Sequence, residues 1–547
     1  MSGDDPLHRP GSADDAGPYD VIVVGAGPAG LYALHRLRGL GLRTLVLEAA
    51  DGVGGTWYWN RYPGARCDVE SMFYSYSFSP ELEQEWEWTE RYAGQPEILR
   101  YLDHVADRFD LRRDIRLGTR VSAAHFDEAG GRWRIRTREG AALTASYCVM
   151  ATGCLSHSRL PAIEGLDDFG GSVYRTARWP HEDVDFSGRR VAVIGTGSSA
   201  VQAIPLIAGQ AAQLTVFQRT PNFSLPARNR PLDPAEWTRT KRNYPRVREL
   251  ARQSVSGVPQ APHAALGSAL AARPAEREAR YRHAWEAGSL FSFADTYSDL
   301  ITDSEANETA GDFVRARIRE TVNDPAVAER LVPRHYPFGA KRLCLDSGYY
   351  ETFNRSHVTL VDLRSSPLTR VTPQAVVTGA DEHPVDSIVF ATGFDAMTGA
   401  LLAVDIRGRE GRTLKAAWAD GPRTYLGLAT AGFPNLFLIT GPGSPSVLSN
   451  MIVSIEQHVD WIADTLQWLS LRGATSFEAA HEAEDAWTAH VDALSAATLL
   501  PRAASWWTGA NIAGKPRTFM PYLGGVKSYR ETCDAVAADG YRGFIVT

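Results

Sequence analysis

The chain has few of the features that mark secreted, metal-binding or membrane proteins. Its cysteines form no CxxC pair and no other spacing typical of metal ligands; there are five, at Cys67, Cys148, Cys154, Cys344 and Cys533. We therefore expect reduced thiols, no metal site and a cytoplasmic protein. No apolar run is long enough to span a membrane, so we expect no membrane partner.

A surplus of positive charge is missing too. The 57 lysines and arginines are outnumbered by 64 aspartates and glutamates, and no basic stripe or block of like charge occurs. Nothing therefore indicates a nucleic-acid partner, and no obligate protein partner is evident. Residues 1–18 are acidic, rich in Gly and Pro, and lack the basic-then-apolar order of a signal peptide, so we predict a disordered tail there.

What the chain does contain is a duplicated pattern. At 19–48 the strand-like YDVIVV is followed by the turn GAGPAG, a helical stretch and a second strand, RTLVLE. At 190–218 the same order recurs as RVAVI, GTGSSA, VQAIPLIAG and QLTVFQ. Each unit has the β-turn-α-β order of a nucleotide-binding fold. Because 547 residues exceed one core, the sequence predicts an α/β protein with two Rossmann-like dinucleotide-binding domains.

The first glycine turn carries a complete dinucleotide pattern. Gly25 permits the tight turn, Gly27 lets the backbone approach a pyrophosphate, and Gly30 lets the helix pack close to the strand. The helix N-terminus then faces the phosphates. Glu48 ends the next strand, where a carboxylate accepts hydrogen bonds from ribose hydroxyls. A site so near the N-terminus, followed by GGTW at 54–57, favours FAD over a nicotinamide cofactor.

The second turn differs at the strand end. Gly195, Gly197 and Ala200 repeat the glycine pattern, but Gln218 stands where the first unit has its acid, and Arg219 follows. An acid would repel a 2′-phosphate, whereas a neutral residue beside an arginine accepts one through charge-assisted hydrogen bonds. The second site is therefore predicted to bind NADPH rather than NADH.

Two dinucleotides in one chain imply electron transfer between them. A flavin disulfide reductase would need a redox cysteine pair after the first unit, and only Cys67 is available there. An amine oxidase would not need the second nucleotide site. The remaining interpretation is reduction of the flavin by NADPH, followed by reaction with O2.

The domains are expected to be discontinuous. Residues 225–335 are rich in Arg, Ala, Glu and Tyr with helical periodicity, and strand-like pieces return after 336. We interpret 225–335 as a helical insertion. The boundaries that follow are 19–154 and 394–547 for the FAD-binding domain, and 155–224 and 336–393 for the NADP-binding domain.

Longer motifs resemble the type I Baeyer–Villiger monooxygenases over nearly the whole chain from about residue 19. These are GGTWYWNRYPGARCD at 54–68, FQRTPNF at 217–223, PFGAKRLCLDSGYYETFNR at 337–355, GPGSPSVLSNM at 441–451 and SWWTGANIAGKPR at 505–517. The resemblance implies an FAD- and NADPH-dependent enzyme that inserts one oxygen atom of O2 next to a ketone carbonyl. An ester or lactone would form through a C4a-peroxyflavin.

One motif departs from the family pattern. The family signature FxGxxxHxxxW is here FGGSVYRTARW at 169–179, with Arg175 in place of the histidine. Arginine can donate hydrogen bonds but cannot accept one, and it stays charged. The change puts in doubt how the domains are positioned and how NADPH use is coupled to product. A tolerated structural exchange and an altered reaction both stay open.

The resemblance also assigns roles to single residues. Arg342 matches the family's catalytic arginine, and Asp68 would orient it; a purely structural ion pair is the alternative. Lys341 and Trp506 match residues that bind NADP in the family. The alternative for Lys341 is a solvated lysine, and the alternative for Trp506 is an aromatic residue of the core. The FAD residues would include Thr56, Trp57, Asp68, Tyr74, Val121 and Met451. The NADP residues would include Thr196, Ser198, Ser199, Gln202, Arg219, Thr220, Lys341, Arg342 and Trp506. The substrate pocket would be formed by Cys154, Leu155, Leu343, Ser446, Val447 and Leu448.

Two other functions compete with ketone oxygenation. The first is an N- or S-oxygenating flavin monooxygenase, to which the histidine-to-arginine change lends some weight. The second is a nucleotide-binding redox sensor without turnover, against which Arg342 and Asp68 speak.

Overall fold

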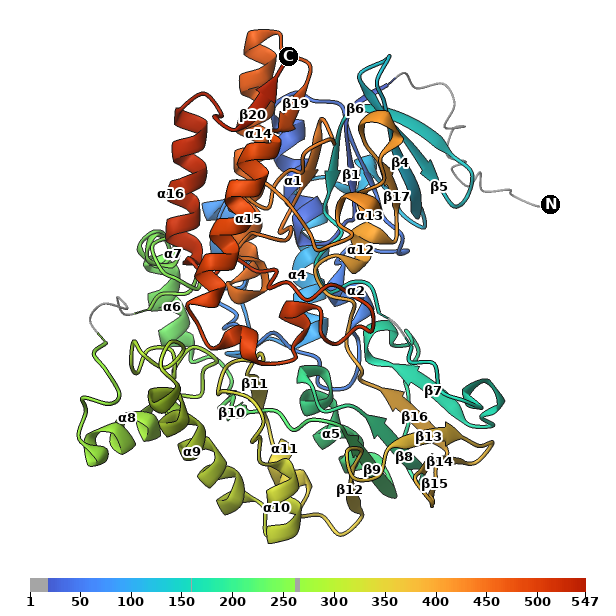
Figure 1. Cartoon of the computed structure of the whole chain (residues 1–547), viewed down its shortest axis with the longest axis vertical. Coiled ribbons are helices and arrows are strands. Elements are labelled where there is room, and N and C mark those ends of the chain that lie inside the picture. The colour runs from blue at the N-terminus through green and yellow to red at the C-terminus, as the bar shows by residue number, and fades with distance from the viewer. Residues whose placement is uncertain (1–17, 159, 261–265) are drawn as a thin grey trace, which may run out of the picture.

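The first nucleotide unit lies at the centre of a mixed sheet. The computed structural model describes residues 18–158, 160–260 and 266–547, so the predicted tail 1–18 lies outside the described residues apart from Pro18. The first sheet has the order β17-β4-β5-β6-β1-β2-β3, with β18 also pairing with β6. Figure 1 shows its strands β1, β4, β5, β6 and β17 in the upper part of the molecule. Its strands are β1 (Tyr19–Val24), β2 (Thr44–Leu47), β3 (Ile115–Arg116), β4 (Val121–Asp127), β5 (Arg132–Thr137), β6 (Ala142–Met150), β17 (Asp405–Arg407) and β18 (Leu436–Leu438).

The second nucleotide unit forms a separate, wholly parallel sheet of order β12-β9-β8-β16-β7. Its strands are β7 (Ser172–Arg175), β8 (Arg190–Ile194), β9 (Gln213–Gln218), β12 (Val358–Asp362) and β16 (Ser387–Phe390). The chain therefore leaves this sheet after β9 and re-enters it at β12. The two-Rossmann fold class predicted from the sequence is confirmed.

The same burial pattern explains both units. β1 pairs with strands on both sides, and the last four residues of YDVIVV are buried, as a continuous apolar run requires. The crossover helices are α1 (Pro28–Gly39) and α5 (Ser198–Gln210). Both begin right after a glycine turn, so their N-termini lie at the carboxyl ends of β1 and β8, where such folds bind ligands.

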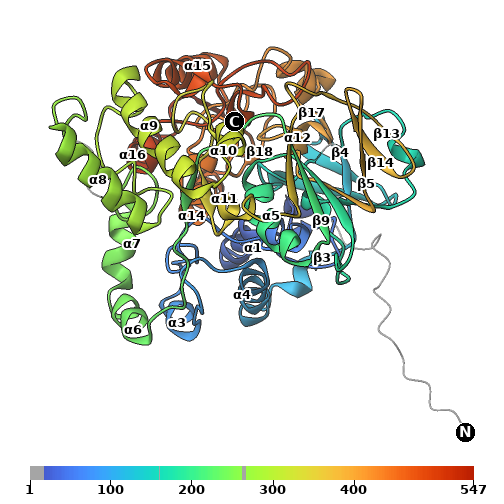
Figure 2. The same ribbon diagram turned by 90° about the horizontal axis from the view of Figure 1, so that it is seen from below.

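The described part of the predicted insertion has its helices between Pro234 and Leu331, with non-helical segments between them. It contains α6 (Pro234–Arg242), α7 (Tyr244–Arg252), α8 (Pro274–Ala287), α9 (Ser304–Thr321) and α10 (Pro325–Leu331). Asp233, Asp303 and Asp324 cap α6, α9 and α10 by accepting hydrogen bonds from backbone N–H groups. Figure 2 shows α6, α7 and α8 along one side of the molecule, away from the two sheets. The chain enters and leaves the insertion through a short parallel pair, β10 (Ser224–Pro226) and β11 (Cys344–Asp346).

Three long helices complete the fold beside the first sheet: α14 (Met451–Arg472), α15 (His481–Ala496) and α16 (Gly525–Ala538). In Figure 1, α14 and α16 run beside one another, with α1 next to α14. In the described part of the chain, no helix is long and apolar enough to cross a membrane. The remaining elements are α2 (Thr56–Trp59), α3 (Pro80–Glu85), α4 (Gln95–Arg108), α11 (Tyr349–Thr352), α12 (Gly399–Leu402), α13 (Leu414–Ala417), β13 (Leu368–Val371), β14 (Ala375–Thr378), β15 (Asp381–Pro384), β19 (Phe477–Ala479) and β20 (Phe544–Val546).

Candidate active site

The first glycine turn leaves no room for side chains. Gly25 has φ +108°, and a Cβ on Gly30 would lie 1.8 Å from the Gly25 carbonyl oxygen. A Cβ on Gly27 would meet the Cα of Gly55 at 3.4 Å, so the GGTW segment lies across the turn. Bare backbone at the N-terminus of α1 is the surface that a dinucleotide pyrophosphate needs. The residues present therefore fit FAD.

Glu48 fixes this turn through hydrogen bonds between its carboxylate and the backbone. It is 5% exposed, and its two carboxylate oxygens accept hydrogen bonds from the backbone N–H groups of Ala26, at 2.6 Å, and Ala50, at 2.8 Å. Burial raises the pKa of Glu48, against the effect of these two N–H groups. Sequence reasoning gave Glu48 a ribose-binding role only and missed the clasp on the turn, because the Ala26 bond joins residues 22 positions apart.

The other predicted FAD residues lie in separate places. Trp57 is buried in α2, and its indole N–H donates to the Tyr74 hydroxyl at 3.1 Å. Thr56 is exposed at the start of the same helix. Met451 opens α14 and packs between the two largest apolar clusters, whereas Val121 opens β4 and packs in a third cluster.

The second glycine turn resembles the first with one difference. Gly195 has φ +114°, and its Cβ would lie 2.5 Å from the Ala391 carbonyl oxygen. A Cβ on Gly197 would meet nothing within 4 Å, and Ala200 is fully buried against the sheet. The Thr196 hydroxyl donates to the Thr220 carbonyl at 2.9 Å. The turn is thereby tied to the strand end that carries Arg219.

Two cations lie together beside this turn. Burial and the nearby charge of Arg219 lower the pKa of Lys341, which also lies 5.2 Å above the Tyr336 ring. Among the described residues, neither Lys341 nor Arg219 has a carboxylate within 4.0 Å. Gln218 is 1% exposed; its side-chain N–H donates to the Arg330 carbonyl, and its Oε1 has no partner within the described chain. Unpaired cations and a free acceptor fit a phosphorylated ribose.

The predicted NADP residues on α5 contact the protein as well. Gln202 accepts from the Tyr62 hydroxyl at 2.8 Å and donates to the Arg66 carbonyl at 3.1 Å. A Cβ on Gly64 would lie 2.5 Å from the Gln202 carbonyl oxygen. The Ser198 hydroxyl is 3.3 Å from the Cys344 sulfur. Burial raises the pKa of Tyr62 to about 12, although a hydrogen bond with Ser199, the next residue of the helix, opposes the rise. α5 therefore docks on the GGTW-containing segment, a contact that sequence reasoning missed.

Arg342 and Asp68 form a bidentate pair across the two nucleotide units. Nε of Arg342 donates to Asp68 at 3.0 Å, and Nη2 donates to both carboxylate oxygens at 2.8 and 2.7 Å. Nη1 donates to the Val447 carbonyl at 2.7 Å. Burial acts to lower the pKa of Arg342, but the charge of Asp68, its hydrogen bonds and the nearby Cys67 and Cys344 together outweigh burial, so the pKa is raised. The guanidinium is therefore a fixed cation.

The predicted substrate-pocket residues gather near this pair. Ser446 is fully buried with φ +37°, and its hydroxyl donates to the Thr440 carbonyl at 3.3 Å. Burial raises the pKa of Cys154 to about 11, although a hydrogen bond with Ser446 opposes the rise. The other members belong to one apolar cluster, in which Trp506 also packs: Cys154, Val447, Leu155, Leu343 and Leu448.

The segment that carries Trp506 is anchored by two contacts that sequence reasoning did not identify. Lys515 forms an ion pair with Asp395 at 2.6 Å, and the Asn511 side chain donates to the Phe394 carbonyl at 2.7 Å. Both acceptors lie on the crossover from the second sheet back to the first. The charged GKPR end of the 505–517 motif was the one sequence feature that could have indicated such an anchor.

Arg175, the departure from the family signature, lies on the edge strand β7 and pairs with Phe390 of β16. Close by, burial and the charges of Arg120, Arg175 and Arg138 lower the pKa of Arg178. The Arg178 guanidinium lies 5.3 Å above the Trp59 ring, next to the GGTW helix α2. Arg175 is thus one of several arginines where the linker meets the first nucleotide unit.

Similarity to known proteins identifies the family to which the chain belongs. A family model described as pyridine nucleotide-disulphide oxidoreductase matches residues 22–257. A Baeyer-Villiger monooxygenase from Pseudooceanicola batsensis is 42% identical over 530 residues, which cover 96% of each chain. The chain belongs to the Baeyer–Villiger monooxygenase family. As a member of that family it is a flavin monooxygenase whose cofactors are FAD and NADPH.

Two further similarities bear on chemistry and fold. A phenazine N-monooxygenase from Lysobacter antibioticus is 42% identical over 543 residues, covering 97% of this chain and 98% of the relative. The structure of an oxidized steroid monooxygenase bound to NADP superposes with a TM-score of 0.92 and 55% identity, covering 97% and 99% of the two chains. The family thus includes a relative named for oxygenation at nitrogen.

Proposed function

We propose that this Baeyer–Villiger monooxygenase inserts one oxygen atom of O2 next to the carbonyl of a small-molecule ketone, giving an ester or lactone. The observation that carries the proposal is the fixed Arg342–Asp68 pair beside the apolar cluster of Cys154, Val447 and Leu448. When bound, FAD supplies the oxygen-activating chemistry and NADPH the reducing equivalents.

Arg342 has the donor that this reaction needs. A guanidinium has five N–H hydrogens and does not give up a proton at neutral pH. Asp68 engages Nε and Nη2, and Val447 takes one hydrogen of Nη1. The second Nη1 hydrogen has no partner within the described chain, so it is free for a developing oxyanion on the substrate. A preorganised cation in a partly dry site is an effective stabiliser of such charge.

Asp68 acts by positioning in this proposal. Its carboxylate fixes two edges of the guanidinium plane, and the Val447 carbonyl fixes a third. The Ser446–Leu448 turn, in which Ser446 and Val447 are buried, lets the same backbone that orients Arg342 contribute side chains to the ketone pocket. Orientation and pocket shape are therefore coupled through Val447.

The remaining assignments belong to the same proposal. Arg219 and Lys341 would hold the 2′-phosphate of NADPH, and the backbone at Gly25, Gly27 and Gly30 would hold the pyrophosphate of FAD. Residues 19–154 and 394–547 form the FAD domain, and 155–224 and 336–393 the NADP domain. The enzyme acts in the cytoplasm. Support comes from the unpaired cations beside Gln218 and the bare first turn.

A panel of ketones with NADPH and O2 tests the reaction. We expect ester or lactone with NADPH consumption, and bleaching of the flavin when NADPH is mixed with the enzyme without oxygen. If amines or sulfides are oxygenated and no ketone is, the second candidate, an N- or S-oxygenating enzyme, replaces this one; the phenazine N-monooxygenase relative motivates it. A flavin that NADPH cannot bleach contradicts both.

A further inference from the structure

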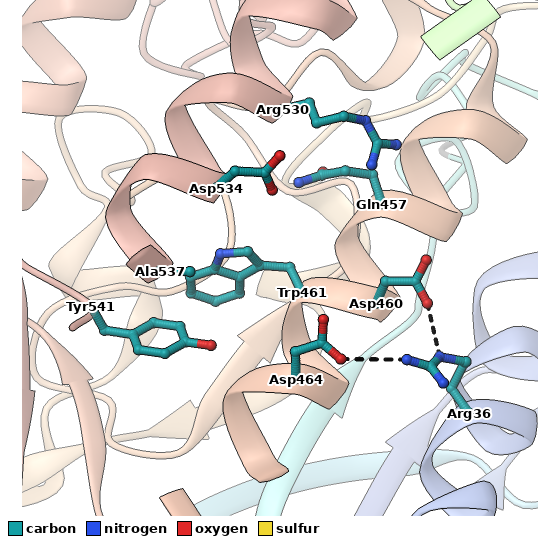
Figure 3. A pocket seen from close by; sticks show the side chains of 9 residues that line it. All are labelled: Arg36, Gln457, Asp460, Trp461, Asp464, Arg530, Asp534, Ala537 and Tyr541. Carbon is teal, nitrogen blue, oxygen red and sulfur yellow. Dashed lines mark hydrogen bonds and ion pairs between the residues drawn. The ribbon is translucent and has the colours of Figure 1, made fainter. Parts of the chain in front are cut away.

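A cavity of about 410 Å³ lies between α1, α14 and α16, on residues that play no part in the candidate active site. Its walls come from Arg36 on α1, four residues of α14, and four at or beyond α16 (Figure 3). The lining residues are Arg36, Gln457, Asp460, Trp461, Asp464, Arg530, Asp534, Ala537 and Tyr541. The volume suits a small molecule.

The base of the cavity contains an unsatisfied amide. Gln457 is 4% exposed, and neither its Oε1 nor its Nε2 has a hydrogen-bond partner within the described chain. Figure 3 shows the side chain reaching from α14 into the cavity toward α16. Burial raises the pKa of the nearby Cys533 thiol to about 12, and contact with the Gln457 amide opposes this rise, but a thiol is a weak partner. Buried amides are normally paired, because leaving one unpaired costs about 1–3 kcal/mol.

A cation without an ion pair lies beside this amide. Nε of Arg530 is buried and unpartnered, and among the described residues no carboxylate comes within 4.0 Å of its guanidinium. Burial lowers the pKa of Arg530. Arg36 on the opposite wall differs, because it is paired with Asp460 at 2.8 Å and Asp464 at 3.4 Å. The unused positive charge is therefore on the α16 side, next to Gln457.

The mouth has the opposite character. Asp464 and Asp534 are exposed there, and the pKa of Asp464 is raised by burial and by the charges of Asp460 and Asp534, although Arg36 opposes the rise. The lining has three carboxylates and two guanidinium groups, which leaves one negative charge. Trp461 and Tyr541 add aromatic faces, which attract cations. The mouth therefore favours an ammonium group.

We propose that this cavity is a binding site for a small amino acid. Its carboxylate lies between Arg530 and Nε2 of Gln457, and its ammonium group faces Asp464 and Asp534. The carboxylate satisfies the buried donors at the base, and the ammonium relieves the repulsion between acids at the mouth. Because α14 begins at Met451, one of the FAD residues predicted from the sequence, an occupied site would brace the helix that begins there.

The FAD-loaded full chain tests the proposal by isothermal titration calorimetry, with 4-aminobutyrate as the probe. Butyrate and butylammonium carry one charge each and separate the two halves of the site. We expect saturable 1:1 binding of 4-aminobutyrate, and at least about tenfold weaker binding of either analogue, as loss of a charge-assisted hydrogen bond predicts. Butyrate or butylammonium binding as tightly as the amino acid would overturn the assignment.

Three variants locate the site. Arg530→Met and Gln457→Met should each weaken 4-aminobutyrate by about tenfold or more, whereas Arg542→Met, an exposed arginine paired with Asp539 outside the cavity, should not. Asp534→Asn changes an exposed residue, so it should fold. It should weaken 4-aminobutyrate but not butyrate, because butyrate has no ammonium group to lose a partner and the charge of Asp534 near Arg530 is removed. Binding that is absent in the parent enzyme, or unchanged in Arg530→Met and Asp534→Asn, refutes the site. Neither readout depends on ketone turnover.

Discussion

Replacing Arg342 by alanine should separate flavin reduction from oxygen transfer. The side chain supplies the one cation held by both the Asp68 carboxylate and the Val447 carbonyl. Removing a single preorganised donor to a developing oxyanion costs about 2.7–4 kcal/mol, or roughly 10²–10³ in kcat. Arg342 is charged and only about a quarter exposed, at 24%, so we expect the upper end of that range.

The variant also leaves Asp68 without three hydrogen bonds of 2.7–3.0 Å. Because the carboxylate is 20% exposed, water reaches it, and we expect a loss of stability of about 1–3 kcal/mol rather than unfolding. Arg342→Lys keeps the charge but loses the two-pronged contact with Asp68, so its rate should lie between those of alanine and arginine.

Two measurements on the same protein decide the matter. Rapid mixing with NADPH in the absence of O2 follows flavin bleaching, and product analysis after aeration counts ester per NADPH consumed. In Arg342→Ala we expect normal FAD content, near-normal bleaching and ester formation slower by about 10³. Arg315→Ala is the matched control, because Arg315 is a buried arginine paired with Glu308 and Asp312 inside α9. It should lose stability but keep ester per NADPH.

The role given to Arg342 is wrong if bleaching fails together with ester formation, since the arginine would then act on hydride transfer. It is equally wrong if ester appears at close to the parent rate.

Three further changes have defined outcomes. Arg219→Ala and Lys341→Ala should each raise KM for NADPH by about tenfold, the cost of a charge-assisted hydrogen bond, and leave KM for NADH unchanged; equal effects on both cofactors would contradict the 2′-phosphate assignment. Gly30→Ala should abolish FAD retention because its Cβ would lie 1.8 Å from the Gly25 oxygen, whereas Gly39→Ala, with open space in the same helix, should retain FAD. Burial, with a smaller effect from Arg530, lowers the pKa of His458 from 6.5 to about 3, so the unfolded chain takes up a proton that the folded one refuses. Stability should therefore fall as pH drops from 7 to 5, by at most about 1.4 kcal/mol per pH unit; His458→Gln, which can still accept from the Thr440 N–H, should show a shallower fall in melting temperature.

Local sequence patterns predicted the parts of the fold that are local. The two strand-turn-helix units follow from runs such as YDVIVV and RVAVI, in which burial on both faces demands apolar residues and a glycine turn demands bare backbone. The helices of the predicted insertion lie between Pro234 and Leu331, but its first residues include β10, because SLP pairs with a strand that lies more than 100 positions later.

The contacts that the sequence did not predict are long-range. Glu48 clasps the turn at Ala26, and Gln202 docks on Tyr62 and Arg66. Glu48 and Gln202 are residue types that suit contacts with a cofactor. Their hydrogen-bond partners within the protein depend on how segments far apart in the sequence pack together, which local patterns do not show. The positive φ of Ser446 is of the same kind, since serine carries no signal for a left-handed conformation.

The proposed catalytic arrangement of Arg342, Asp68 and Val447 forms only through such long-range contacts. Asp68 follows the GGTW segment of the first unit, Arg342 approaches β11 after the helical insertion, and Val447 belongs to the turn before α14. Asp68 and Val447 cannot hold the Arg342 guanidinium until the second unit is docked. Gly64 and Gln202 form that dock, and a Cβ at 64 would press on the Gln202 carbonyl at 2.5 Å. In the proposed reaction, oxygen transfer therefore depends on the relative position of the two nucleotide units, because the Arg342–Asp68 pair joins them.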